Sequence, residues 1–266
     1  MKIILSRKGF DSGYGKVASP ILSGGTMLSM PIPAGNEGSK TKFTDLSYDG
    51  QNYRTLLESL GYPKDQGECC HLDPDIREEI RTNPIPDWKP AFGQEKAAQS
   101  YLQKCGVGEG DIFLFFGWFK KAKAADKGFY ETGNLHAIYG YLQVGKIITD
   151  EKEIREQYPW HPHSEGGYDK NNTLYIPSER LIIDRTDFGK GYGTLDYRQD
   201  RILTKENLTR AQWIPHPFLM PEYILGCNRK NSSKKDALYY QGQWQEAVFD
   251  GDHNPGLIEW VKKILS

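Results

Sequence analysis

The sequence predicts an α+β fold in which a mixed or mostly antiparallel sheet carries helices on its faces. Two segments rich in aromatic and β-branched residues, 111–119 and 135–144, are bounded by glycines and predict two adjacent strands. Amphipathic spacing and helix-end residues predict four helices, near 51–60, 94–105, 150–158 and 255–265. The chain contains no internal repeat and no low-complexity segment. A partly closed barrel is one form that a sheet of this kind takes, and the prediction includes it.

The first part of the chain begins with a short apolar strand, 2–6, and a polar loop follows it. Residues 20–31 hold two apolar segments around a Ser-Gly-Gly-Thr turn. They predict a hairpin, because glycine supplies the positive φ that a tight turn requires. Gly61 and Gly106 stand directly after the first two predicted helices, as expected for glycine beyond a helix C-terminus.

The connection between the two central strands is polar and basic. It contains four lysines, Lys120, Lys121, Lys123 and Lys127. The connection is long enough to stand out from the sheet, and we expect it to meet a ligand.

The second half of the chain adds further strands and the last two helices. Pro159 ends the third helix. Strands are predicted at 172–176, 180–183 and, within 239–249, at 242–249. Asn254 is the expected N-cap of the C-terminal helix, which begins at Pro255 and turns an apolar stripe towards the core.

The composition indicates one domain, 1–266, because no proline-, glycine- or serine-rich stretch marks a boundary. Hydrophobic residues make up 38% of the chain, with 6 Trp, 16 Tyr and 11 Phe, which is enough for a sizeable core. The mean hydropathy of -0.66 indicates that loops occupy much of the chain. The net charge of -1 gives no overall attraction for nucleic acid, so nucleic-acid binding would have to use a local basic patch.

The cysteines predict a reduced protein of the cytoplasm. Cys69 and Cys70 are adjacent while Cys105 and Cys227 are isolated, so no disulfide or zinc spacing is present. The apolar run at the N-terminus is too short for a signal peptide. No stretch approaches the roughly 20 apolar residues of a membrane span. We therefore expect a soluble, cytoplasmic protein that has no membrane partner.

His71 and Asp73 are the first candidates for chemistry. Residues two apart in an extended backbone share a face, so the imidazole and the carboxylate could converge on one metal ion or one substrate proton. The alternative is structural and the more common of the two. Asp73 before Pro74, with acidic residues close behind, is typical of a helix N-cap with proline at the first helical position.

His161 and His163 flank Pro162 and form the second candidate. Proline between the histidines predicts an extended backbone from which both rings point to one side. With the His71 and Asp73 pair, they supply the ligand types of a two-histidine, one-carboxylate iron site, which keeps positions open for oxygen chemistry. Iron is the first candidate cofactor, with manganese or zinc as alternatives. A wall of polar loop residues, or hydrogen bonds to a ligand, is the structural alternative.

Three weaker candidates concern substrate binding. Arg7, Lys8 and Asp11 lie in a glycine-jointed loop that can approach a phosphate, or that simply forms a polar turn. The glycine-rich stretch 187–193 can cradle phosphates through its N–H groups, but it lacks the spacing of a nucleotide-binding P-loop. His136 begins the second central strand, where a lone histidine is usually structural.

Several motifs together resemble the third family of nucleotide modification associated domains. These motifs are SRKGFD at 6–11, SPI at 19–21, HLDPD at 71–75, GEGDIFLFFGWF at 108–119, GYLQVG at 140–145 and HPH at 161–163. The resemblance covers nearly the whole chain. It implies a role in making or handling modified bases, with nucleic acid or nucleotides and other proteins of a modification pathway as partners, but no agreed catalytic residue. The two central strands also resemble the barrel of PUA-like and EVE domains, as an analogy of fold only.

The resemblance and the motifs lead to a first hypothesis, an enzyme that modifies a nucleobase or nucleotide. His71, Asp73 and His163 are its catalytic candidates, and its metal ligands are His71, Asp73, His161 and His163. The substrate-binding candidates are Arg7, Lys8, Asp11, Trp118, Phe119, His136 and Gln143. Among them the cations hold phosphate and the two aromatic rings stack on the base.

A second hypothesis is a module that binds a modified base without catalysis, using the same aromatic rings as a cage. It is favoured by the absence of a recognised nucleophile or cofactor loop in the sequence. The concentration of histidines in two short motifs favours the enzyme instead. A third hypothesis is a metal-dependent enzyme that modifies a peptide or a small metabolite.

Overall fold

The computed structural model describes most of the chain. The described residues are 1–34, 39–63, 67–123, 128–130, 133–167, 169–226, 233–234, 237–240 and 245–266. Lys127 and Cys227, which figured in the sequence analysis, lie outside them.

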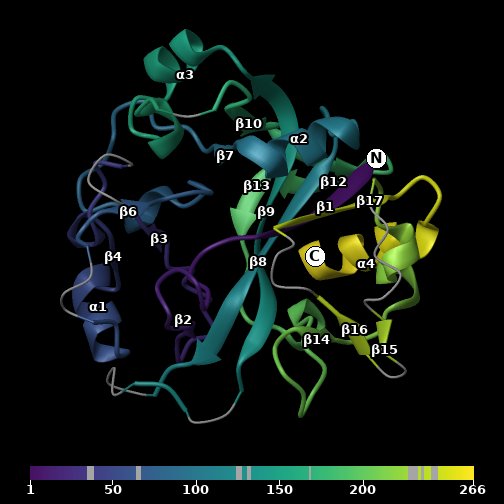
Figure 1. Ribbon diagram of the computed structural model, residues 1–266, viewed down its shortest axis with the longest axis horizontal. Helices are drawn as coiled ribbons and strands as arrows, with labels where there is room; N and C mark the ends of the chain where they lie inside the picture. The colour runs from purple at the N-terminus through teal and green to yellow at the C-terminus, as the bar shows by residue number, and fades with distance from the viewer. Residues whose placement is uncertain are drawn as a thin grey trace.

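A curled, mixed sheet forms a half-barrel at the centre of the molecule (Figure 1), which confirms the predicted α+β class. Its strands, in spatial order, are β17 (Glu246–Asp250), β1 (Lys2–Arg7), β8 (Ile112–Lys121), β9 (Leu135–Ile148), β10 (Thr173–Pro177) and β7 (Phe92–Gln94). β2 (Ser19–Ile21) lies beside β8, and β13 (Tyr192–Thr194) lies beside β9. β1 and β2 run parallel to β8, whereas the other pairs of this sheet are antiparallel.

The predicted pair of central strands is confirmed. β8 and β9 are antiparallel neighbours, with Ile112 opposite Gln143 and Phe119 opposite Leu135. Both faces of the sheet are buried, which explains why β8 is apolar almost throughout instead of alternating. Alternate residues of β1 and β8 enter two different cores.

One core packs against α4 and the other against α2. Ile3, Leu5 and Leu114 join the first core together with Leu257 and Val261 of α4. The opposite face holds the second core, which contains Phe92, Phe113, Phe115 and Leu102 of α2. Strand β1 is therefore covered on both sides.

All four predicted helices are present. They are α1 (Tyr53–Ser59), α2 (Lys96–Lys104), α3 (Glu151–Gln157) and α4 (Pro255–Leu265). Gly61 and Gly106 follow α1 and α2 with positive φ, as predicted. The Asn254 side chain does not cap α4 as predicted, because its amide donates to the Phe218 carbonyl instead. In the described part of the chain, no helix has the length and apolar character needed to cross a membrane.

Short elements complete the fold. The two-residue and hairpin strands are β3 (Ile32–Pro33), β4 (Ser47–Tyr48), β5 (Gln51–Asn52), β6 (Cys70–His71), β11 (Arg180–Ile183), β12 (Thr186–Lys190), β14 (Gln212–Trp213), β15 (Ser233–Lys234) and β16 (Ala237–Tyr239). The turns of 3-10 helix are η1 (Phe43–Asp45), η2 (Glu78–Ile80), η4 (Pro162–Ser164), η5 (Gln199–Arg201), η6 (Pro217–Leu219) and η7 (Pro221–Tyr223). The predicted hairpin at 20–31 is a tight reversal with one bridge, Ile21 to Met27, because β2 pairs with β8.

The glycine-rich stretch 187–193, a weak candidate for phosphate binding, forms strands in the structure. Most of it belongs to β12 and β13. Two of its glycines serve close packing, whereas Gly189 has a positive φ and open space around it. A Cβ at Gly191 would lie 1.9 Å from the Ser178 carbonyl oxygen, and one at Gly193 would lie 3.1 Å from the Tyr141 ring.

Candidate metal centre

His71 and Asp73 reach the candidate centre from one extended segment. His71 is the last residue of β6, which pairs with β3, and Asp73 follows two residues later. Within the described segment 67–123, the first helical turn after Asp73 is η2, which begins only at Glu78. The predicted N-cap role of Asp73 is therefore wrong, and its carboxylate is directed to other partners.

His161 and His163 come from the segment after α3. Pro162 opens the 3-10 turn η4, so the backbone is not extended through His163 as predicted. His161 is the N-cap of this turn, and its Nδ1 accepts a hydrogen bond from the His163 backbone N–H at 3.2 Å. The two imidazole centroids still lie only 5.5 Å apart.

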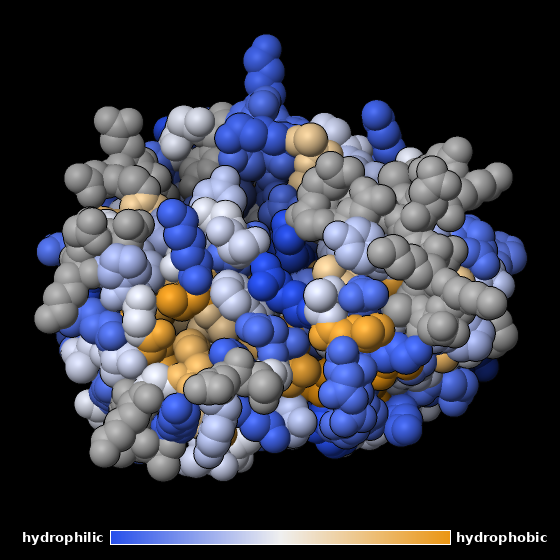
Figure 2. Space-filling view, turned by 60° about the horizontal axis from the view of Figure 1, so that its bottom comes forward, coloured by the Kyte–Doolittle hydropathy of each residue, from blue (hydrophilic) through white to orange (hydrophobic). Residues whose placement is uncertain are grey.

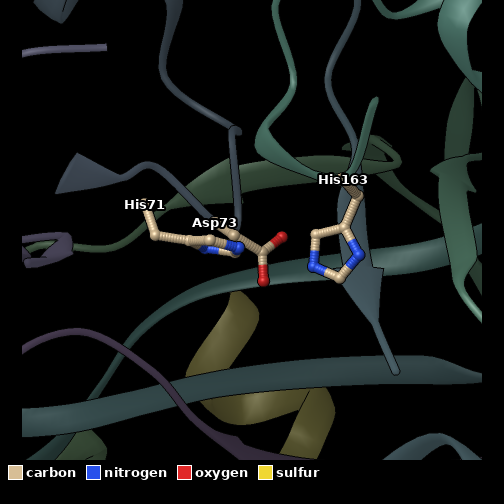
Figure 3. Close-up of side chains that lie close together, drawn as sticks. All are labelled: His71, Asp73 and His163. Atoms are coloured by element: carbon tan, nitrogen blue, oxygen red, sulfur yellow. The ribbon is translucent and has the colours of Figure 1, made fainter. Parts of the chain in front are cut away.

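The three side chains of the candidate centre, His71, Asp73 and His163, converge from these two segments. One donor atom from each lies within 4.8 Å of the other two. The imidazole centroids are 5.2 Å apart with the rings nearly perpendicular, and the carboxylate lies between them (Figure 3). Two donors on one first-row metal ion are about 3 to 4 Å apart, since each bond is about 2.1 Å long. A small adjustment of the side chains would thus bring all three donors onto one ion.

Asn172 fixes the orientation and tautomer of His163. The Asn172 amide nitrogen donates to the His163 carbonyl oxygen at 2.9 Å, so its amide oxygen is the atom that lies 2.6 Å from His163 Nδ1. An amide oxygen only accepts hydrogen bonds, and His163 Nδ1 must therefore carry the proton. The lone pair is left on Nε2. A histidine whose second nitrogen donates to a fixed oxygen is the usual arrangement of a metal ligand.

His161 is better suited to support Asp73 than to bind the ion. Its Nδ1 is occupied by the His163 N–H, so the proton of a neutral ring is on Nε2. That Nε2 lies 3.5 Å from Asp73 Oδ1. His161 is fully buried and lies outside the three-residue group. Among the described residues its Nε2 makes no hydrogen bond, so its contact with Asp73 is electrostatic.

Asp73 is held as a carboxylate by three neighbours. The Gly93 N–H donates to Oδ1 at 2.6 Å, and the Lys8 ammonium lies 3.6 Å from Oδ2. Burial alone would raise the pKa of Asp73, but Lys8 and the neighbouring histidines hold it well below its usual range. The group is thus a negatively charged ligand at neutral pH.

The two histidines of the centre are neutral. Burial lowers the pKa of His71 to about 4 and that of His163 to about 3, although the Asp73 charge opposes both shifts. A neutral imidazole has the lone pair that metal binding requires. The residues therefore fit a two-histidine, one-carboxylate site in both donor type and protonation state.

A buried carboxylate that the sequence analysis missed lies behind the centre. Glu246 accepts hydrogen bonds from Ser6 Oγ at 3.0 Å and Gln94 Nε2 at 2.7 Å. Lys8 Nζ lies 3.8 Å from its Oε1, so Lys8 stands between two carboxylates. Burial raises the pKa of Glu246 to about 7, while Lys8 lowers it. Strand alternation could have predicted its burial, because Glu246 lies on the same face of the strand as Val248.

A cleft of about 570 Å³ opens beside the centre, and we call it the site cleft. Its lining includes the predicted catalytic residues and three predicted binding residues, namely His71, Asp73, His163, Arg7, Lys8 and Asp11. The structure thus brings the residues of the first loop and of the two histidine motifs together.

A comparison with protein families shows which family the chain belongs to. The sequence profile of nucleotide modification associated domain 3 matches residues 2–250. The chain belongs to this family. The match confirms the resemblance carried by the motifs and connects the protein with nucleotide modification. No curated protein and no solved structure matched the chain.

The remaining predicted binding residues of this family member lie elsewhere. Trp118 and His136 line a second cleft of about 820 Å³. Phe119 is fully buried in the core that packs against α2, which leaves no ring face for a base. Gln143 is buried, and its side chain donates to the carbonyls of Gly110 and Ile182.

His136 has a structural partner, as expected for a lone histidine on a strand. Its Nδ1 accepts a hydrogen bond from Trp213 Nε1 at 3.0 Å, so the ring proton is on Nε2. Burial lowers the pKa of His136 to about 3, so this ring is also neutral.

Proposed function

We propose that this member of the family is a metal-dependent enzyme that modifies a base in nucleic acid or in a nucleotide. His71, Asp73 and His163 are the proposed ligands, and iron is the proposed ion, with manganese and zinc as alternatives. The convergence of the three donor atoms within 4.8 Å carries the proposal. The fixed tautomer of His163 supports it, because a purely structural histidine has no need of an aligned Nε2 lone pair.

Three residues of the chain orient the proposed ligands. Asn172 orients His163, while Gly93 and His161 orient Asp73. Bound iron would supply oxidative chemistry with dioxygen, and manganese or zinc would supply Lewis-acid activation of water.

Cations of the site cleft would receive the substrate. Lys8, buried between Asp73 and Glu246, lines the site cleft with its ammonium group. Arg7 lines the same cleft with its side chain 21% exposed, and it is the proposed contact for a substrate phosphate.

The second hypothesis, a module that binds a modified base without catalysis, has less support at this site. An aromatic cage made of Trp118 and Phe119 is not assembled beside His71, since Phe119 is buried and Trp118 lines the second cleft. The third hypothesis, a peptide or small metabolite as substrate, is separated from the first by the product analysis below.

The test is metal binding followed by product analysis. Protein purified without chelator is stripped, reloaded anaerobically with Fe²⁺, Mn²⁺ or Zn²⁺, and titrated by calorimetry. We expect one ion per chain and a loss of binding in His163→Ala. The control is His253→Ala, which removes an exposed histidine whose side chain is 87% accessible.

The loaded protein is then incubated with DNA, RNA and free nucleotides, and the nucleosides are analysed by mass spectrometry. A mass change that needs His163 supports the proposal. A protein that binds no ion, or whose His163→Ala variant binds it unchanged, refutes the metal centre. An intact centre that alters no nucleoside refutes the substrate class and leaves the third hypothesis.

A further inference from the structure

A third cleft lies beside the second one, and both are lined by cations and aromatic rings. We call the cleft lined by Arg7, Trp118 and Arg210 the arginine cleft. The cleft of about 890 Å³ lined by Lys121 and Tyr197 is the lysine cleft. Figure 2 turns the lower end of Figure 1 towards the viewer, where β8 ends and β14 lies, and shows a mostly hydrophilic face that is hollowed near its centre.

The arginine cleft adjoins the site cleft on one side and the lysine cleft on the other. Arg7 and Asp11 line both the site cleft and the arginine cleft. Thr204, Lys205 and Glu206 line both the arginine cleft and the lysine cleft. A polymer that occupies one cleft can therefore pass into the next without leaving the surface.

The arginine cleft and the lysine cleft each hold a cation stacked on an aromatic ring. The Arg210 guanidinium lies 4.2 Å from the centroid of the Trp118 ring. The Lys121 ammonium lies 4.7 Å from the centroid of the Tyr197 ring. Alternating cations and ring faces are the features by which proteins hold single strands, since phosphates need the cations and bases stack on the rings.

The charges of the arginine cleft are incompletely balanced by the described residues. Three cations line it, Arg7, Lys205 and Arg210, against two carboxylates, Asp11 and Glu206, and Asp11 pairs with Arg7 at 3.7 Å. Asp11 faces Arg7 with Oδ2, while its Oδ1 accepts the N–H groups of Gly13 and Tyr14. Burial lowers the pKa of Arg210, the Asp11 charge opposes this shift, and the Arg7 charge adds to it.

We propose that the arginine cleft and the lysine cleft bind a single-stranded nucleic acid next to the site cleft, so that the substrate is a base within a strand. This rests on the proposed function and deepens it by naming a polynucleotide as the substrate class. Trp118 and Tyr197 stack on bases, while Arg7, Arg210 and Lys121 contact phosphates. An acidic polypeptide would use the cations but would have no bases to stack on the rings.

Binding is measured on metal-free protein by fluorescence anisotropy. The probes are labelled single-stranded DNA and RNA of about 12 nucleotides, which is within the site sizes of single-strand binders. Unlabelled nucleoside monophosphate, double-stranded DNA and polyglutamate serve as competitors. We expect either single strand to bind at least about ten-fold more tightly than each competitor.

The variants assign that binding to the two clefts. Trp118→Leu should weaken strand binding about five-fold or more, the size associated with loss of one stacked base. Arg210→Gln should weaken it as well, and it should reduce the slope of log K against log salt by about 0.7. Arg180→Gln is the matched control, because it removes one positive charge from the exposed β11–β12 hairpin, paired with Asp187 at 2.7 Å.

Equal losses in Arg210→Gln and Arg180→Gln would show nonspecific attraction and overturn the proposal. Equal binding of polyglutamate or of monophosphate would also overturn it. Because the assay uses no metal, strand binding with a failed metal centre refutes the proposed function alone. A working centre that acts on mononucleotides, with no strand binding, refutes this inference alone.

Discussion

Gly93 is the tightest point of the candidate centre, and Gly93→Ala tests how closely the centre is built. A Cβ at this position would lie 2.3 Å from His163 Cδ2 and 2.6 Å from Nε2. Ordinary contact begins near 3.4 Å, so the imidazole would have to retreat by about 1 Å. It has little freedom to do so, since Asn172 holds its other edge at 2.6 Å.

We expect Gly93→Ala to lower metal affinity by more than its loss of stability alone would explain. A 1 Å displacement of a ligand is comparable to removal of a residue that orients it, which costs on the order of 10 to 100-fold in affinity. Overpacking should lower the free energy of unfolding by about 1 to 3 kcal/mol. Calorimetric titration with Mn²⁺ measures the first quantity, and urea unfolding of the metal-free protein measures the second.

Gly24→Ala is the matched control, because a Cβ there would meet no atom within 4 Å. It should leave both quantities unchanged. A Gly93→Ala protein with the affinity and stability of the wild type would refute the packing of Gly93 against a ligand imidazole.

Three further predictions concern the same centre. Asn172→Ala should lower metal affinity on the order of 10-fold or more in calorimetry, whereas Asn171→Ala, which loses bonds to α2 instead, should not. The free energy of unfolding should fall as pH decreases from about 6.5 to about 4, because the unfolded chain binds protons at His71, His163 and the distant His136 before the folded chain does; a flat urea-unfolding profile over this range would contradict it. Because the folded-state pKa of Glu246 is raised from 4.5 to about 7, wild-type stability should decline relative to Glu246→Gln as pH rises through that window. The relative change should approach about 3 kcal/mol, and an unchanged difference between acidic and alkaline conditions would count against it.

Local patterns were sufficient to predict the main elements. Burial on both faces makes β8 a continuous apolar segment, and positive-φ glycines end α1 and α2. These features depend on residues close in sequence, so a single sequence carries them.

The chemistry of Asp73 could not be decided from the sequence. Aspartate before proline has the same local signature in a helix N-cap and in an extended loop. The distinction depends on Gly93 and Lys8, which contact the carboxylate from distant segments. The same limit applies to His161, whose role follows from one hydrogen bond to Nδ1.

Strand alternation could have refined two predictions. Trp118 and Phe119 are neighbours on β8, so their rings must face opposite sides of the sheet and cannot both stack on one base. The structure buries Phe119 and leaves Trp118 at the arginine cleft. Glu246 is likewise an inward position of β17, opposite Ser6 of β1, and the pattern of that strand marks it as a buried carboxylate.

The central claim is that His71, Asp73 and His163 hold one metal ion. Its most direct test is a crystal structure of the protein loaded with Mn²⁺, with anomalous scattering recorded for the metal. We expect a single strong peak within bonding distance of all three side chains, about 2.0 to 2.2 Å. A peak elsewhere, or none at this position in crystals that contain the ion, would contradict it.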